Sequence, residues 1–186
     1  MTSLPCRAIA ILFLLFSYKN ACSGSLSTER SPVAEVAVLV EKLVMADSAQ
    51  SNEILSKINS IRKQYPENTD ILLMYTNSLI GEKHYKEGIE FLKTLCKKKP
   101  NRTCLLTRCM LTQRLGDKEI GCYEEVVRLS EQQHLIDSDY ITALFFTDTK
   151  KFSTVKQQLI NKNQLNENDF LVFNSDEETI LHEFFP

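Results

Sequence analysis

The chain has 186 residues, a formal net charge of -2, an apolar fraction of 43% and a charged fraction of 25%. These values are ordinary for a globular protein of one-domain size. The charge argues against a nucleic-acid-binding protein, which should present a strongly basic face. With only five Gly and five Pro, the composition is typical of a mostly helical chain.

The N-terminus has the features of an export signal. Arg7 supplies a positive charge and is followed by an unbroken apolar run over residues 8–16. This run suits the core of a signal peptide and is too short to span a bilayer. We predict a signal peptide over residues 1–21 and a flexible tether over residues 22–32, with a buried core helix as the alternative interpretation of the apolar run.

Cys22 is a candidate lipidation site. The segment Ala21-Cys22-Ser23-Gly24 resembles the end of a bacterial lipoprotein signal, in which the Cys is lipidated. Ser23 after that Cys would favour the outer membrane, as implied by the same resemblance. Lys19 departs from the motif, which has an apolar residue there, and ordinary cleavage after Ser23 is the alternative.

Apolar residues at helical spacing predict a series of helices along the remaining chain. The ranges are 33–46, 51–65, 69–81, 85–98, 103–115 and a helix ending near 132, then a helix after Ser138, a partner around 152–159, and a short final helix after Asn174 or Ser175. Ser51 is the predicted cap of the second helix, Thr69 or Asp70 that of the third, and Asn174 or Ser175 that of the final helix. Residues 161–169 are predicted to form a loop, and the short run 170–173 is the one candidate for extended structure.

Three apolar triplets recur with a spacing of 34 residues. They are Ile54, Ile58 and Ile61, then Gly88, Leu92 and Leu95, then Cys122, Val126 and Leu129. Pro66 and Pro100 keep the same spacing. A period of this length is typical of stacked helix–turn–helix repeats, which form binding scaffolds more often than enzymes.

The chain resembles the tetratricopeptide repeat (TPR) family over residues 31–164. In the best match, residues 68–100, Tyr85 opens the second helix, Gly88 stands at the small residue where two helices touch, and Pro100 closes the repeat. Departures are the early Gly81, Leu72 in place of an aromatic residue, and Cys122 in place of a small one.

The resemblance implies an all-α fold for residues 33–186. TPR-like helical hairpins would form a short right-handed α-solenoid, and the final helix would cap its open end. An irregular helical bundle is the alternative.

Four cysteines remain beyond Cys6 and Cys22, and an even number in an exported chain predicts disulfides. Cys96 and Cys104 flank one predicted helix-to-helix turn, and Cys109 and Cys122 flank the next. The repeat geometry therefore favours Cys96–Cys104 and Cys109–Cys122. A zinc site, for which the spacings contain no CxxC, and buried free thiols are the alternatives.

No catalytic motif or phosphate-binding loop is present, so we expect no enzymatic activity and no cofactor. In TPR domains the first helix of each hairpin lines a concave groove. Asn77, Arg108 and Arg114 lie on such helices and resemble part of a cluster that grips a terminal carboxylate in some of these domains. A solvated helix face is the alternative interpretation for each of the three.

The sequence thus favours a protein-binding adaptor or assembly factor that faces the periplasm and is anchored at the outer membrane. Its partners would be another envelope protein and, through a lipid, the membrane, with no nucleic acid and no small-molecule substrate. A periplasmic immunity protein that neutralises a toxic effector, such as a phospholipase or wall hydrolase, is the alternative. A soluble secreted factor would require an unmodified Cys22.

Overall fold

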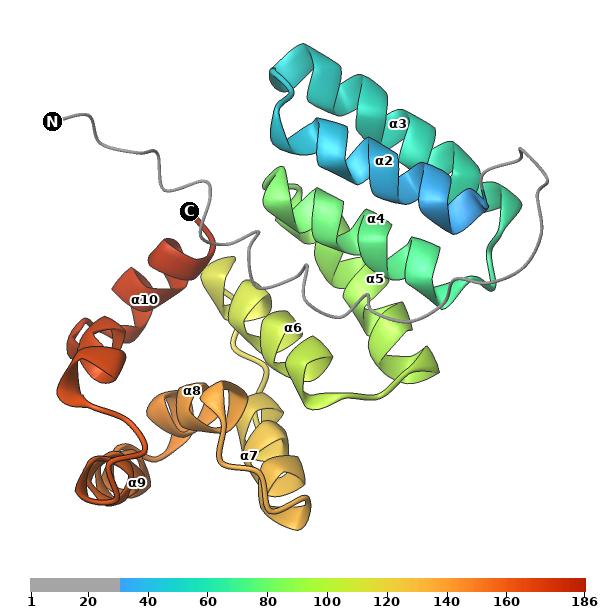
Figure 1. Ribbon diagram of the computed structural model, residues 1–186. Coiled ribbons are helices and arrows are strands. Elements are labelled where there is room, and N and C mark those ends of the chain that lie inside the picture. Colours follow the sequence, from blue (N-terminus) through green and yellow to red (C-terminus); the bar gives the residue numbers. More distant parts are fainter. Residues whose placement is uncertain (1–30) are drawn as a thin grey trace, which may run out of the picture. The chain divides into compact units, whose positions relative to one another are not determined.

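The computed structural model describes residues 31–186, and these residues form helices and turns without any strand (Figure 1). The predicted all-α fold class is therefore confirmed for this part of the chain. The predicted signal peptide, Cys22 and all but the last two residues of the predicted tether lie outside the described residues. The chain divides into two compact units, Met1–His84 and Tyr85–Pro186, which we call the N-terminal and C-terminal units.

The described part of the N-terminal unit is a three-helix assembly. Its helices are α2 (Pro32–Val44), α3 (Ser48–Gln64) and α4 (Thr69–Gly81), and each packs against the other two. Val36, Ile58 and Ile71 are fully buried between them. Pro32 occupies the first position of α2, where its missing N–H costs nothing.

The helix caps differ from the predicted ones by one to four residues. Asp47, not Ser51, caps α3 in a capping box with Gln50, and Asn68, not Thr69 or Asp70, caps α4. Ser51 lies inside α3 and is buried. Each of these short polar side chains accepts hydrogen bonds from backbone N–H groups of the first turn, so the extended residue just outside the helix is the one that can cap it.

The C-terminal unit continues as a chain of helices in which sequence neighbours pack together. Its elements are α5 (Tyr85–Lys98), α6 (Arg102–Arg114), α7 (Cys122–Gln132), α8 (Ser138–Thr147), α9 (Thr149–Asn161), the 3-10 helix η1 (Glu167–Asn174) and α10 (Glu177–Phe184). Contacts join α5 to α6, α6 to α7, α7 to α8 and α8 to α9, and α6 also contacts α8. The connections are short, as is typical of helix–helix pairs.

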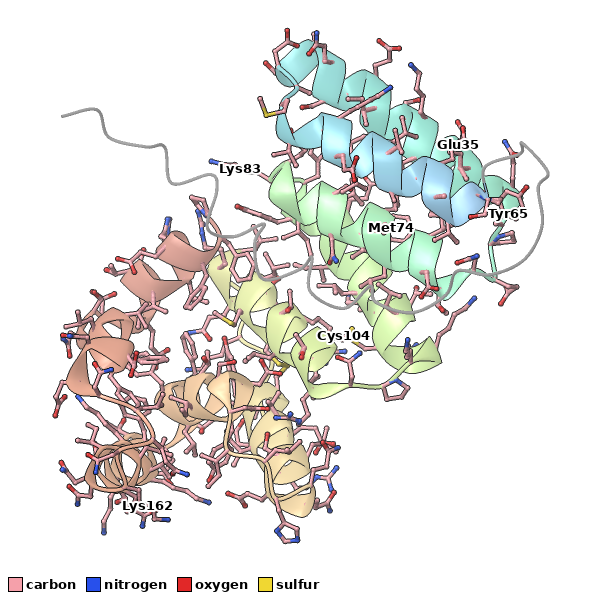
Figure 2. All side chains as sticks on the ribbon, viewed as in Figure 1. Glu35, Tyr65, Met74, Lys83, Cys104 and Lys162 are labelled. Atoms are coloured by element: carbon pink, nitrogen blue, oxygen red, sulfur yellow. A yellow bond between two sulfur atoms is a disulfide. The ribbon has the colours of Figure 1, made fainter. Side chains whose placement is uncertain are left out.

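Both disulfides join the predicted partners and lie in the C-terminal unit. Cys96–Cys104 links α5 to α6, and Cys109–Cys122 links α6 to α7, each with Cα atoms 5.8 Å apart. Figure 2 labels Cys104 near the start of α6. Each bridge spans a single turn between packed helices, which is the reason the sequence spacing alone identified the pairs.

The turn between α6 and α7 is longer than the sequence suggested. Gly116 and Gly121 both have a positive φ, of 92° and 80°, which glycine adopts without strain. As a result α7 begins only at Cys122, and Ile120 in the turn is 98% exposed.

Residues 162–166 form the predicted loop, whereas the end of that segment and the run predicted as extended form the 3-10 helix η1. Side chains three residues apart lie on the same face of a 3-10 helix. Phe170 and Phe173 use this spacing to pack against Phe152 of α9 and close the end of the α8–α9 hairpin. The role predicted for the final helix, to cap the open end of a solenoid, stays a prediction.

The final helix α10 packs against α6 (Figure 1). Its Ile180 and Leu181 are buried in one cluster with Met110 of α6, Tyr123 of α7 and Phe146 of α8. The chain thus returns from η1 to α6.

The cap of α10 also differs from the predicted one. Asp176, not Asn174 or Ser175, caps the helix.

The 34-residue spacing is visible in the burial of the helices. Positions at this spacing are buried in α4, α6 and α8: Leu72, Leu106 and Tyr140, and also Tyr75, Cys109 and Ala143. In α3, α5 and α7, Ile58, Leu92 and Val126 are all buried. Ile54 and Leu129 of the predicted triplets are only half-buried. The repeated positions therefore contribute to the core of each unit.

Candidate binding surface

The three residues predicted to line a groove fall in different units. Asn77 is half-buried on α4 of the N-terminal unit, whereas Arg108 and Arg114 are half-buried on α6 of the C-terminal unit. Their joint role as one carboxylate-binding cluster stays a prediction. Within the C-terminal unit, both arginines already have partners in the chain itself.

Arg108 is held by the turn that follows its own helix. One of its terminal nitrogens donates to Glu119 at 2.9 Å and lies 3.8 Å from the Cys122 sulfur. Its Nε is buried and has no hydrogen-bond partner. The guanidinium therefore fixes the α6–α7 turn beside the Cys109–Cys122 bridge, with one donor unused.

Arg114 binds the C-terminal segment of the chain. Its Nε donates to the carbonyl oxygen of Phe185 at 3.0 Å. The hydroxyl of Tyr85, at the start of α5, donates to the carbonyl oxygen of Pro186 at 2.6 Å. The rings of Tyr85 and Phe185 meet edge to face, with centroids 6.1 Å apart, an arrangement that aromatic pairs favour.

The other end of α10 is held by polar side chains. Gln113 of α6 donates through Nε2 to the Glu177 carboxylate at 2.8 Å, and Lys118 lies 3.8 Å from the same oxygen. Glu177 stands in the first turn of α10, where a negative charge complements the helix dipole. We call the five residues that contact or face α10 and the two residues after it the α6 surface: Tyr85, Gln113, Arg114, Lys118 and Tyr123.

Two buried polar atoms of the α6 surface are left without hydrogen-bond partners. They are Oε1 of Gln113 and the hydroxyl of Tyr123. Burial raises the pKa of Tyr123 far above the usual range of a tyrosine, and the nearby Glu177 charge adds to this effect. An unpaired polar atom in a protein interior costs about 1–3 kcal/mol, so α10 fits this surface imperfectly.

The position of Tyr85 also changes the pKa of its hydroxyl. Burial raises the pKa of its hydroxyl, and the positive charge of Arg114 partly offsets that rise. The hydroxyl is therefore protonated, and able to donate, over an extended pH range.

The sequence pointed to Arg114 but not to the other members of this surface. The sequence predicts for Tyr85 only that it opens the second helix of a repeat, and its bond to Pro186 joins residues 101 positions apart. No sequence motif points to Gln113 or Lys118. The acidic first turn of α10 was the one available signal, since it requires a polar or basic counterpart when docked.

The described residues contain few other candidate sites. A shallow open hollow in the N-terminal unit is lined by residues of α2, α3 and the turn between them, including Met45, Ile54 and Lys57. In residues 31–186 there is no group of three or more side chains suited to hold a metal ion, and no helix there is long and apolar enough to cross a bilayer.

The C-terminal unit thus presents a surface that binds a short helix through apolar anchors in its middle and polar contacts at both ends. Comparison of the chain with protein-family models, curated proteins and solved structures finds no match. The functional assignment therefore depends on the chain itself.

Proposed function

We propose that this protein is an exported, TPR-like adaptor or assembly factor that binds another protein through the first helices of its repeats. The observation that carries the proposal is the recurrence of buried positions every 34 residues in paired short helices, as at Leu72, Leu106 and Tyr140. Stacked helical hairpins of this kind form extended surfaces that suit protein ligands.

The two disulfides support an oxidising compartment. Disulfides persist in secreted and periplasmic proteins and are rare in the cytosol. Together with the leader and the lipoprotein-like Cys22 expected from the sequence, Cys96–Cys104 and Cys109–Cys122 favour a periplasm-facing protein anchored at the outer membrane.

The proposal can be tested by affinity capture of partners from envelope fractions of the native host. The bait is the full chain, compared with Asn77→Ala, Arg108→Gln and Arg114→Gln. Lys93→Gln on α5 is the matched control, because Lys93 is exposed and pairs with Glu90 of its own helix. Cys22→Ser tests the anchor separately.

We expect subunits of an envelope assembly to be recovered by the wild type and the control, and to be depleted by at least one of the three substitutions. Loss with Cys22→Ser would support the lipid anchor. Tight recovery of a single toxic hydrolase would instead contradict the adaptor proposal and support the immunity protein.

A further inference from the structure

We propose that α10 is an exchangeable occupant of the α6 surface, and that the partner binds there with a short amphipathic helix of the same pattern. This inference rests on the proposed function, because it takes the α6 surface as a protein-binding surface. It names the surface that binds the partner and the chemistry of the partner's helix. It also implies that α10 covers this surface in the free protein, so the partner must displace α10.

The brevity of α10 makes exchange feasible. The helix has eight residues, and isolated helices shorter than about 12–15 residues are marginal in water. Only Ile180 and Leu181 are buried, whereas Phe184 is 41% exposed. The helix therefore depends on its docking, and local opening would leave the disulfide-linked helices α5, α6 and α7 in place.

The docking of α10 leaves two buried polar atoms without hydrogen-bond partners. They are Oε1 of Gln113 and the hydroxyl of Tyr123. Native structures pair nearly all such atoms, so their presence here needs an explanation. A ligand that supplied a donor to Gln113 and an acceptor to Tyr123 would bind more tightly than α10 does.

The tail of α10 is recognised mainly through its backbone. Arg114 and Tyr85 donate to the carbonyl oxygens of Phe185 and Pro186, so these bonds do not depend on which side chains the bound segment carries. A different sequence can therefore take the same path. The edge-to-face contact of Tyr85 adds a preference for an aromatic residue at the position of Phe185.

These contacts define the chemistry of the ligand. It is a helix with an acidic residue in its first turn for Gln113 and Lys118, two adjacent aliphatic residues for the apolar centre, and an aromatic residue near its end. Such docking of an amphipathic helix into an apolar groove is a common mode of peptide recognition. The α10 sequence itself is the model ligand.

The first test is amide hydrogen exchange of the wild-type chain with both disulfides intact. We expect the amides of α10 to exchange at least tenfold faster than those of α6 and α8, because α10 opens locally. Exchange of α10 at the same rate as α6 and α8 would overturn the proposal, since α10 would then open only with the whole unit.

The second test uses a fluorescent peptide of residues 174–186 as the probe. Ile180→Ser together with Leu181→Ser opens α10, and peptide mapping of both disulfides with circular dichroism establishes that the variant is folded. We expect the opened variant to bind the probe at least tenfold more tightly than the wild type does. Adding Arg114→Gln should weaken binding at least tenfold, whereas adding Lys93→Gln should not change it.

Absence of probe binding to the folded, opened variant would overturn the proposal. Dimerisation of the opened variant without probe would also overturn it, because the exchanged occupant would then be a second copy of this chain. Either failure is distinguishable from failure of the proposed function. If envelope capture still succeeds, the protein is an adaptor in which α10 is a fixed part of the fold.

Discussion

Arg102 shows how one side chain joins three helices of the C-terminal unit. Its guanidinium donates to both carboxylate oxygens of Asp137, at 2.9 and 2.6 Å, and to the Ser130 hydroxyl at 3.0 Å. Asp137 also caps α8 by accepting from the N–H of Tyr140. The Arg102 guanidinium holds the pKa of Asp137 below its usual value, although burial opposes the shift.

We predict that Asp137→Asn lowers the free energy of unfolding by about 1 kcal/mol at neutral pH, because it removes a charged hydrogen bond and asparagine still caps α8. The pKa of Asp137 is lower in the folded state, so its contribution is complete above the unfolded pKa and is lost as pH falls through the folded one. Urea unfolding across the acid range should therefore show a smaller pH dependence for Asp137→Asn. Asp117→Asn, at an exposed turn position, is the matched control for the same change of side chain.

A second residue-scale prediction concerns Tyr85. Burial raises its pKa in the folded state, so folding favours the protonated hydroxyl below the unfolded pKa, and this preference is lost as pH rises through the folded one. Absorbance titration of the wild type minus that of Tyr85→Phe should isolate a tyrosine that ionises above the usual pKa of about 10. A difference curve centred at or below that pH would contradict the burial of this hydroxyl.

At the scale of elements, each disulfide joins two packed helices across one turn, but the two bridges have different surroundings. Cys109 and Cys122 are both buried in the cluster shared by α6, α7, α8 and α10. Cys96 and Cys104 are half-buried at the edge of α5 and α6. Cys109–Cys122 also closes the larger loop, with a sequence separation of 13 rather than 8.

We predict that replacing Cys109 and Cys122 together by alanine costs about 3 kcal/mol, from the loss of loop closure alone. Replacing Cys96 and Cys104 together should cost less, because that bridge closes a shorter loop in a less buried place. Chemical unfolding of the two double variants gives the comparison. Equal losses would show that burial and loop length do not distinguish the bridges.

At the scale of the whole molecule, the disulfides formed by residues 31–186 lie in one of the two units. Both disulfides lie in Tyr85–Pro186, whereas the described helices of the N-terminal unit depend on apolar packing and caps. The response to reducing agents should therefore differ between the units.

We predict that reduction increases amide exchange in α5, α6 and α7 and leaves the exchange of α2 and α3 nearly unchanged. Hydrogen exchange with mass spectrometry, with and without a dithiol reductant, resolves the two units in one experiment. The double alanine variants serve as controls, because reduction should have less effect where a bridge is already absent. An equal loss of amide protection in both units would contradict the prediction that the disulfides stabilise the C-terminal unit alone.

The sequence by itself determined the helical elements and the local links between them. Apolar spacing located the helices, including α5 at its observed bounds, because helical burial repeats every three to four residues. The disulfide partners followed from turns between neighbouring helices. Cap positions and η1 were missed, since several short polar residues compete to cap each helix and a 3-10 helix has its own period.

Only the tertiary structure decided where α10 docks and what holds it. The bonds from Arg114 and Tyr85 to the last two residues span 71 and 101 positions, and no local pattern encodes such a distance. The fold fixed these contacts because Ile180 and Leu181 had to bury their apolar surface, and α6 with its neighbours offered the place to do so.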